Sequence, residues 1–280
     1  MALHGVVEFG RKAMADTVPT DSWSLGDPYE RYVGRWSLPV AREFLDWLAL
    51  PPALRWLDVG CGTGALTAAV LEKCRPARLT GVDPSEAFLQ KANARLQGQA
   101  NFHVASALKL PLHDTDVDVA VSGLALNFFP DPAGGLDEMR RVTACGGTIA
   151  AYVWDYAGRM EFMRHFWDAA VEVSNTARAL DEGNRFPLCR PEALERLFED
   201  AGLRDVELRS IDIATRFADF DDFWLPFLGG QGPAPSYLMS LDEATRHELK
   251  DRLRRRLPVE PDGSISLIAR AWAIRGRVPA

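Results

Sequence analysis

The sequence predicts an α/β protein in which a mostly parallel sheet is covered by helices on both faces, a doubly wound arrangement. Two observations lead to this fold class. Between residues 56 and 153, short apolar runs rich in β-branched residues alternate with segments whose apolar residues recur at helical spacing. Near the carboxyl terminus, segments 206–213 and 265–274 have the composition of long strands, and we expect them to pair antiparallel at the sheet edge. Right-handed crossovers leave few other topologies.

The predicted elements of the first half follow one another closely. A helix starts at Ser37, a residue type typical of helix caps, and stops before the prolines at 51–52. Another helix opens at Asp131 and Pro132, with aspartate as the cap and proline in the first turn, where its missing N–H is not needed. The other predicted elements here are strands at 56–59, 79–82, 102–105, 117–122 and 148–153 and helices at 65–73 and 84–97.

The second half is less regular. We expect a helix over 161–179, and another that follows Pro191 and ends at Gly202. Between the two long strands lies an insertion at about 219–257, which we interpret as a helical lid. It holds a helix capped by Ser240, with Glu243 three residues later. The insertion also carries an aromatic cluster that fits either core packing or a lid over an apolar acceptor, formed by Phe223, Trp224 and Phe227.

Composition excludes several classes of protein. The chain of 280 residues can bury a sizeable core, and none of its apolar stretches, 65–71 among them, approaches the length of a membrane-spanning helix. The net charge is −7 and neither half carries a basic excess, so a nucleic-acid partner is not expected. The four cysteines are far apart and form no C-x-x-C pair, which argues against a zinc site and fits a reducing cytoplasm.

The amino-terminal residues have little patterned structure. Residues 1–20 lack the continuous apolar core of a secretory signal. We expect 1–28 to form a flexible tail in front of one domain covering 29–280, and either Met1 or Met14 fits as the native start.

The strongest motif is the run LDVGCGTG at 57–64, where a strand is expected to end and a helix to begin. Glycines at such a turn let a ligand approach the backbone, and the N–H groups at the helix start favour negative charge. The pattern alone is ambiguous, because Gly60, Gly62 and Ala65 also match the dinucleotide fingerprint G-x-G-x-x-G/A.

Two carboxylates favour a different ligand. Asp58 stands just before the first glycine, where it would repel a pyrophosphate but attract an amine. Asp83 follows 25 positions later at the end of the next predicted strand, where a carboxylate can accept hydrogen bonds from a ribose diol. The pair indicates a ligand with a cationic amine at one end and a ribose at the other.

The segments 57–64 and 81–85 (GVDPS) resemble the signature of the class I S-adenosylmethionine-dependent methyltransferases. More narrowly, segments 104–112 and 116–122 are similar to the small-molecule subgroup, methyltransferase type 11, which includes the quinone-biosynthesis C-methyltransferases. The resemblance is specific over about 29–156. It implies a Rossmann-like, seven-stranded sheet whose terminal strands are antiparallel, and S-adenosylmethionine as the cofactor.

The resemblance also implies roles by position. Asp58 would lie near the methionine amine, and Asp83 would hold the ribose hydroxyls. The remaining implied cofactor contacts are Gly60, Cys61, Gly62 and Thr63 at the methionine portion, Pro84 and Ser85 beside the adenosine, Ser106 and Ala107 at the adenine edge, Ser122 at the amino group, and Tyr32 and Arg35 over the methionine carboxylate. Many relatives carry aspartate at the position of Ser106. Serine accepts a hydrogen bond without charge, so we expect a weaker adenine contact.

The acceptor side offers fewer signals. Asn127 opens a run, NFFP, similar to the Asn-Pro-Pro-aromatic loop of methyltransferases acting on nucleobase amino groups, but its prolines are misplaced, and we interpret it as part of the acceptor pocket. Asp155 fits a general base or a solvated loop carboxylate equally, and Tyr156 lies at the same carboxyl end of a strand. His165 is interpreted as a helix-face residue, and Arg254, at the end of a helix, as offsetting its dipole rather than binding phosphate.

The sequence therefore predicts an S-adenosylmethionine-dependent methyltransferase acting on a small molecule. Two alternatives stay open: a regulatory protein that binds the cofactor without turnover, and an NAD-dependent dehydrogenase. The dehydrogenase requires a second nucleotide-binding half and a hydride-site acid, neither of which is found. The acceptor, the methylated atom and the oligomeric state are not specified by these residues.

Overall fold

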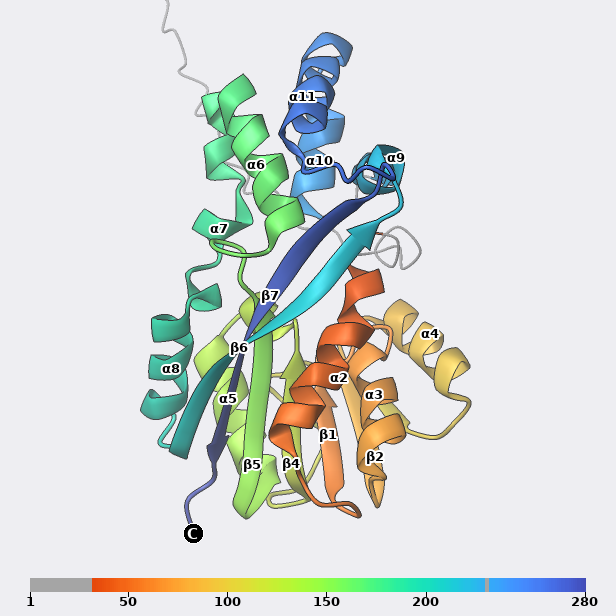
Figure 1. The fold of residues 1–280 in the computed structure, drawn as a ribbon. Helices are drawn as coiled ribbons and strands as arrows, with labels where there is room; N and C mark the ends of the chain where they lie inside the picture. The colour runs from red at the N-terminus through yellow and green to blue at the C-terminus, as the bar shows by residue number, and fades with distance from the viewer. Residues whose placement is uncertain (1–31, 230–231) are drawn as a thin grey trace, which may run out of the picture.

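The computed structural model describes residues 32–229 and 232–280, so the predicted tail at 1–28 and the two candidate starts lie outside the described residues. One sheet has seven strands in the order β3-β2-β1-β4-β5-β7-β6. Among the described strands, β7 runs opposite to the other six, and it pairs antiparallel with β5 on one side and β6 on the other. The predicted α/β class, the mostly parallel sheet and the antiparallel terminal strands are confirmed (Figure 1).

The strands fall close to their predicted positions but several are longer. The buried centre of the sheet is apolar on both faces, as parallel sheets require, with Trp56, Leu57 and Val59 all inaccessible to solvent. At the edge, the last strand in the order alternates, with Ile211, Ile213 and other inward residues buried and their neighbours exposed. The strands are β1 (Arg55–Val59), β2 (Arg78–Asp83), β3 (Asn101–Val104), β4 (Val117–Gly123), β5 (Thr143–Trp154), β6 (Arg204–Phe217) and β7 (Ile265–Arg277).

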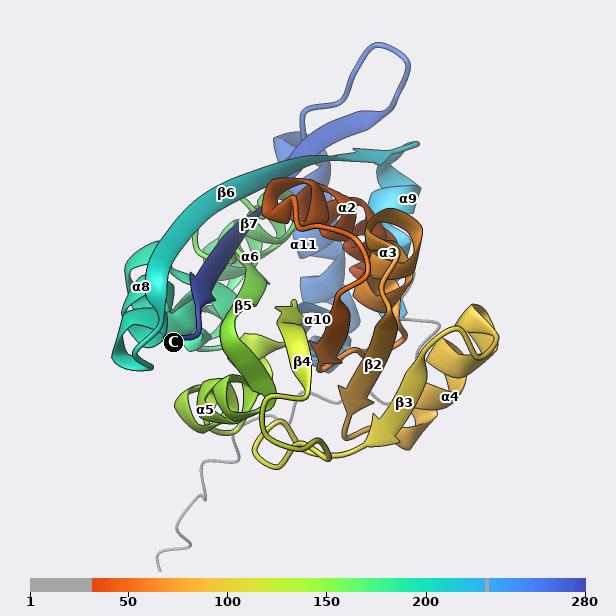
Figure 2. The same ribbon diagram turned by 90° about the horizontal axis from the view of Figure 1, so that it is seen from below.

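Helices cover both faces of the sheet. On one face α2 (Ser37–Leu48) packs against α3 (Ala65–Cys74), and on the other α5 (Pro132–Val142) and α8 (Pro191–Asp200) lie against β5, β6 and β7 (Figure 2). α4 (Glu86–Leu96) flanks the β3 edge. The predicted cap of α5 forms, with Asp131 accepting from Ala133 N and Gly134 N. At α4 the cap is Ser85, which accepts from Phe88 N.

A second helical layer stands beyond the carboxyl ends of the parallel strands, and the long strands β6 and β7 extend into it (Figure 1). The single helix expected over 161–179 is split into α6 and a 3-10 turn, η3. None of the helices within 32–229 and 232–280 is long and apolar enough to cross a membrane. This layer consists of α6 (Glu161–Val173), η3 (Asn175–Ala179), α7 (Glu182–Arg185), η4 (Pro187–Cys189), α9 (Phe220–Trp224), η5 (Leu225–Gly229), α10 (Pro233–Ser240) and α11 (Glu243–Arg256).

Two predicted caps are wrong. Ser37 is the first residue of α2 rather than its cap, because the 3-10 turn η1 (Gly34–Trp36) leads directly into the helix. Ser240 is the last residue of α10, and its hydroxyl donates to Tyr237 O. The cap of α11 is Asp242, which accepts from Thr245 N at 2.7 Å. Ser240 matched the capping pattern in the sequence, but it belongs to the end of α10, two residues before the true cap of α11.

Candidate active site

The loop after β1 is shaped by glycines in the left-handed backbone region. Gly60 and Gly62 have φ values of 75° and 53°. The N–H groups of Gly60 and Cys61 both donate to Val82 O, at 2.7 and 3.0 Å, which ties the loop to β2. A Cβ on Gly60 would lie 2.6 Å from the Cβ of Ala125, whereas one on Gly62 would meet nothing within 4 Å. Gly60 therefore permits close packing, and Gly62 borders open space.

Asp83, at the end of β2, holds this loop through its carboxylate. Oδ2 accepts from Gly62 N at 2.9 Å, and Oδ1 accepts from Ser85 N at 2.8 Å. The residue is 7% exposed, and burial raises the pKa of its carboxyl against the opposing effect of the two backbone donors. Each oxygen keeps a lone pair for a further donor, such as a hydroxyl.

Asp58 is fully buried at the end of β1. Its Oδ2 accepts from the hydroxyl of Thr67 at 2.7 Å, while Oδ1 has no hydrogen-bond partner. Burial raises the pKa of this carboxyl to about 7, although the Thr67 hydrogen bond lowers it. An unpaired buried carboxylate oxygen is destabilising, and a cationic ligand group would supply the missing partner.

Asp58 and Asp83 line one cavity of about 430 Å³. The cavity lies at the carboxyl ends of the strands, the edge at which ligands bind in open α/β sheets. Its lining residues are Val33, Ser37, Asp58, Gly60, Cys61, Gly62, Thr63, Ala65, Leu66, Val82, Asp83, Pro84, Ser85, Phe88, Ala105, Ser106, Ala107, Gly123, Leu124, Ala125, Phe128, Phe129, Pro130, Tyr152, Trp154 and Tyr156.

Comparisons with known proteins identify this arrangement. A family model described as a methyltransferase domain matches residues 57–151. The chain is 29% identical over 167 residues to demethylmenaquinone methyltransferase of Staphylococcus aureus, an alignment that covers 55% of this chain and 69% of that protein. The chain is an S-adenosylmethionine-dependent methyltransferase.

Solved structures share the fold of this methyltransferase at low sequence identity. A Bacillus halodurans protein assigned as a methyltransferase superposes with a TM-score of 0.57 at 18% identity, covering 86% of this chain and 99% of that chain. Phosphoethanolamine N-methyltransferase 2 of Haemonchus contortus, solved with phosphomonomethylethanolamine and S-adenosylhomocysteine, has a TM-score of 0.56 at 14% identity, covering 91% and 57%. These likenesses support the class I fold and do not extend to the acceptor.

S-adenosylmethionine is the cofactor of this methyltransferase, and the cavity fits it. The unpaired oxygen of Asp58 can receive an amine, and the space beside Gly62 admits a ligand against the backbone. Asp83 keeps lone pairs for ribose hydroxyls.

The structure brings most of the sequence-predicted cofactor residues of the methyltransferase to the cavity. Ser106 lines it, with its Oγ accepting from Leu108 N at 3.2 Å. The residues that line the cavity as expected are Asp58, Gly60, Cys61, Gly62, Thr63, Asp83, Pro84, Ser85, Ser106 and Ala107.

Three predicted cofactor residues lie elsewhere. Ser122 is fully buried, with no partner for its hydroxyl, directly before Gly123, which lines the cavity. Tyr32 is 3% exposed among aromatic rings of the helical layer, and its hydroxyl is unpaired. Arg35 forms an ion pair with Asp222 at 2.8 Å, outside the lining residues.

The three weak candidates for a catalytic role also differ in whether they line the cavity. Tyr156 lines the cavity, but Asp155 and Asn127 do not. Both oxygens of Asp155 are used by the turn that follows β5, accepting from Gly158 N at 3.0 Å and Arg159 N at 2.9 Å. The side-chain amide of Asn127 is enclosed, and neither its nitrogen nor its oxygen has a partner.

The aromatic residues of the insertion pack into the core of the helical layer. Phe223, Trp224 and Phe227 are between 1% and 3% exposed, and none lines the cavity. Phe227 stacks on Phe166 of α6 with ring centroids 4.6 Å apart. Of the two interpretations that the sequence left open, core packing and a lid over an apolar acceptor, the structure shows core packing.

Several lining residues were not predicted. Val33, just before η1, and Ser37, the first residue of α2, line the cavity, as does Tyr152 on β5. Phe88 is brought there by the Ser85 cap, which sets the direction of the first turn of α4. The cap was visible in the sequence and could have indicated Phe88, whereas Val33 and Tyr152 depend on the packing of distant elements.

Proposed function

We propose that this methyltransferase binds S-adenosylmethionine between the loop after β1 and the end of β2. Asp58 pairs with the methionine amine, and Asp83 accepts the ribose hydroxyls. Ser106 and Ala107 meet the adenine edge, where the serine contact is weak because a hydroxyl oxygen accepts a hydrogen bond without charge. The other assigned contacts are Gly60, Cys61, Gly62 and Thr63 at the methionine portion and Pro84, Ser85 and Phe88 beside the adenosine.

The acceptor is a small, planar, largely apolar molecule. The observation that carries this proposal is the composition of the second half of the cavity, formed by the loop after β4, the end of β5 and the start of α2. Its side chains are mostly aromatic or aliphatic, and none is charged; they belong to Val33, Ser37, Leu124, Ala125, Phe128, Phe129, Pro130, Tyr152, Trp154 and Tyr156. Flat rings pack well between such side chains.

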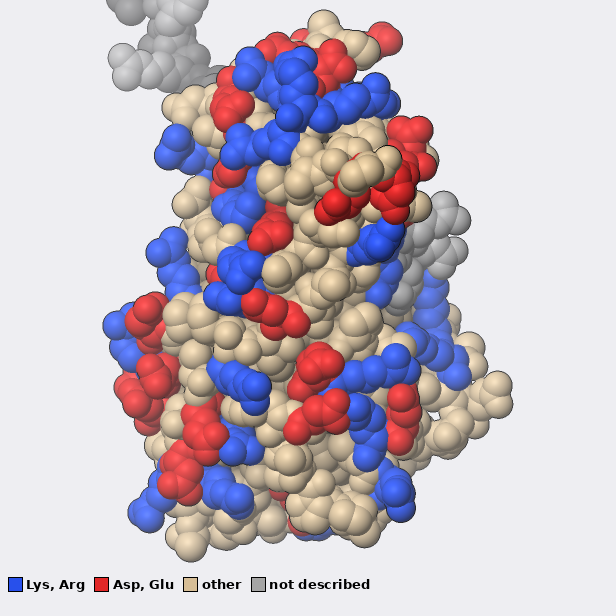
Figure 3. Space-filling view, viewed as in Figure 1, with Lys and Arg blue, Asp and Glu red and all other residues tan. Residues whose placement is uncertain are grey.

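Charge supports the same acceptor class. Among the described residues that line the cavity, none is lysine or arginine, while Asp58 and Asp83 add negative charge. A phosphate-bearing acceptor would find no cation there, and a nucleic acid would need a basic surface. Figure 3 instead shows Lys and Arg interspersed with Asp and Glu on the face in view.

The contribution of the protein is alignment. Bound S-adenosylmethionine supplies an electrophilic methyl group on its sulfonium. The aromatic half of the cavity holds the acceptor in front of that group, and such positioning can contribute about 7–11 kcal/mol to lowering the barrier. Asp155, occupied by its turn, is not placed to take a proton from the acceptor. This favours an acceptor that ionises readily.

We place the protein in the cytoplasm. Cys61, Cys74 and Cys189 are buried free thiols, and Cys145 is an exposed one. Unpaired cysteines persist in reducing compartments, which supports this location.

A methyl-transfer screen over phenols, quinols, carboxylic acids, amines and phosphate esters tests the proposal, with S-adenosylhomocysteine as the measured product. We expect turnover with apolar aromatic acceptors and none with phosphate esters. Calorimetry with S-adenosylmethionine, S-adenosylhomocysteine and NAD tests the cofactor assignment. Turnover confined to phosphate-bearing acceptors would contradict the acceptor class, and binding of NAD alone would contradict the cofactor.

A further inference from the structure

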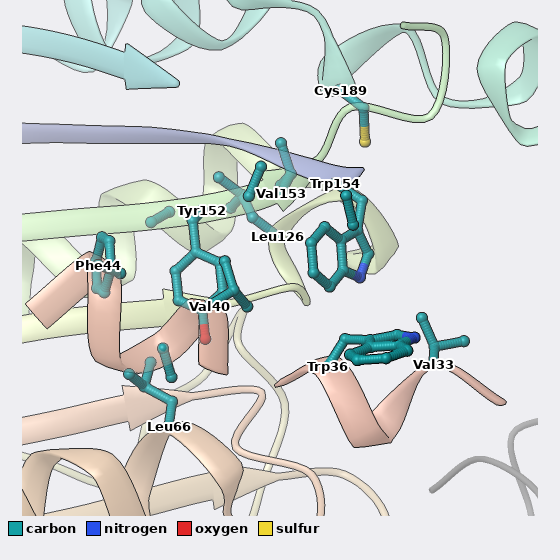
Figure 4. Close-up of a cluster of buried hydrophobic side chains, with 14 of the residues drawn as sticks. Val33, Trp36, Val40, Phe44, Leu66, Leu126, Tyr152, Val153, Trp154 and Cys189 are labelled. Atoms are coloured by element: carbon teal, nitrogen blue, oxygen red, sulfur yellow. The ribbon is translucent and has the colours of Figure 1, made fainter. Parts of the chain in front are cut away.

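One polar group stands in the aromatic half of the cavity without a partner. Trp154, the last residue of β5, is 2% exposed and lines the cavity. Its indole N–H forms no hydrogen bond with any residue in the described part of the chain. Figure 4 shows the indole leaving β5 with its nitrogen edge directed toward the side of Val33 and Trp36. Val33 also lines the cavity, so this edge of the ring faces the space available to a ligand.

The chemistry of the indole limits which ligand atoms can form a hydrogen bond with Trp154. The Nε1–H group only donates, so its partner must be an atom with a lone pair. An unpaired donor at a cavity wall is available to a ligand, and leaving it unpaired once a bound ligand has excluded water would cost free energy. A hydrogen bond to an ionised oxygen is roughly twice as strong as one to a neutral oxygen. The N–H of Trp154 therefore binds an oxyanion more tightly than the corresponding hydroxyl.

We propose that Trp154 forms an oxygen subsite for the methyl acceptor and that the acceptor is a hydroxyarene bound as its oxyanion. This inference rests on the proposed function and specifies its substrate class. It also accounts for the lack of a placed base: an N–H that favours the ionised oxygen lowers the pKa of the bound acceptor, so the proton is lost to water on binding.

The chain contains a matched control for Trp154. Trp272 of β7 lies opposite Val153 of β5 in the strand register. Its indole N–H also has no partner, but it is fully buried and Trp272 does not line the cavity. Replacing either tryptophan with phenylalanine removes an unpaired N–H from one of two adjacent strands. Only Trp154→Phe alters the proposed subsite.

The test uses 4-nitrophenol, whose phenolate is coloured, and the full chain saturated with S-adenosylhomocysteine. Titration gives the dissociation constant and, from the spectrum over pH, the pKa of the bound phenol. In Trp154→Phe we expect affinity for the phenolate to fall about tenfold or more and the pKa of bound nitrophenol to rise by about one unit relative to wild type, since one unit corresponds to a tenfold change. Trp272→Phe should match wild type. Affinity for 4-nitroanisole, which cannot ionise, should change little in either variant.

Several results would overturn the subsite. The first is a wild-type protein that does not bind 4-nitrophenol. The second is a Trp154→Phe protein whose affinity and spectrum match wild type. The third is an equal loss of affinity for nitrophenol and nitroanisole in Trp154→Phe, which would indicate that the tryptophan contributes only its shape. Binding of S-adenosylhomocysteine, measured first, separates this failure from failure of the proposed function. If S-adenosylhomocysteine binds and any of these overturning results is observed, the oxygen subsite is wrong and the cofactor assignment stands.

Discussion

Asp83 accepts a hydrogen bond from the backbone N–H of Gly62, with 2.9 Å between Oδ2 and the nitrogen. The carboxylate that we assign to the ribose therefore also sets the shape of the glycine loop. The two ends of the cofactor site are coupled through one side chain.

Asp83→Asn should weaken binding of S-adenosylhomocysteine about 10- to 150-fold, because hydrogen bonds to charged groups contribute about 1.5–3 kcal/mol. The amide also turns one acceptor oxygen into a donor that faces a backbone N–H. Calorimetry measures the dissociation constant. Asp200→Asn, on an exposed residue at the end of α8, is the control and should bind like wild type. An unchanged constant in Asp83→Asn would remove Asp83 from the cofactor site.

Cofactor binding should depend on pH through Asp58. Burial raises the pKa of its carboxyl to about 7, so in the free protein it gains its charge only near neutral pH. The α-amino group of the ligand stands beside its own carboxylate, so it loses its charge only at a more alkaline pH than a peptide amino terminus, whose pKa is about 8. Affinity for S-adenosylhomocysteine should therefore rise as pH increases through about 7 and fall only at alkaline pH.

Calorimetry between about pH 6 and pH 9 tests this dependence, and about one pH unit below the Asp58 pKa the affinity should be about tenfold weaker. Asp58→Asn should lose the rise and keep the fall, since the fall belongs to the ligand. The same rise in Asp58→Asn and in wild type would assign it to another group.

Much of this site follows from local sequence, and the exceptions have a physical reason. Asp58, Asp83 and the glycines lie where one strand meets one turn, so their positions depend on a few neighbouring residues. Trp154 and Tyr152 also sit at a strand end, but which way they face depends on β7 and α2, far away in the chain. Arg35 illustrates the limit most clearly: its partner, Asp222, is 187 residues distant.

Arg35→Gln tests that distant pairing. The ion pair with Asp222 spans 2.8 Å, with side chains 27% and 34% exposed. Partly exposed pairs contribute about 0.2–1 kcal/mol, so chemical denaturation should show a loss in that range. Because Arg35 does not line the cavity, affinity for S-adenosylhomocysteine should stay the same. A tenfold or greater loss of affinity would instead support the methionine-carboxylate contact predicted from the sequence.

The glycines of the loop should respond differently to an added methyl group. Gly60→Ala places its Cβ 2.6 Å from that of Ala125 at a φ of 75°, so we expect a loss of about 2–4 kcal/mol in the free energy of unfolding. Gly62→Ala meets no atom within 4 Å and should lose only about 1–2 kcal/mol, but its methyl enters the cofactor space and weakens binding. Gly98→Ala, with a φ of 78° and open space, is the control. Equal losses in Gly60→Ala and Gly98→Ala would refute the packing argument.

Glu182 should make the protein less stable as pH rises. This carboxyl is 2% exposed, accepts a hydrogen bond from Trp167 Nε1, and has a pKa raised by burial from 4.5 to about 8. Because the folded state holds this proton more tightly than the unfolded chain, the stabilisation is complete below about pH 4 and is lost as pH rises through about 8. At about 1.4 kcal/mol per pKa unit the loss is at most about 5 kcal/mol.

Glu182→Gln keeps an oxygen for Trp167 but cannot ionise, so its free energy of unfolding should fall less between about pH 5 and pH 9. Glu172→Gln changes a half-exposed carboxylate paired with Arg252 and Arg256, and should retain the wild-type decline. Denaturant titrations at both pH values measure the slopes, and parallel slopes for wild type and Glu182→Gln would exclude Glu182 as the titrating group.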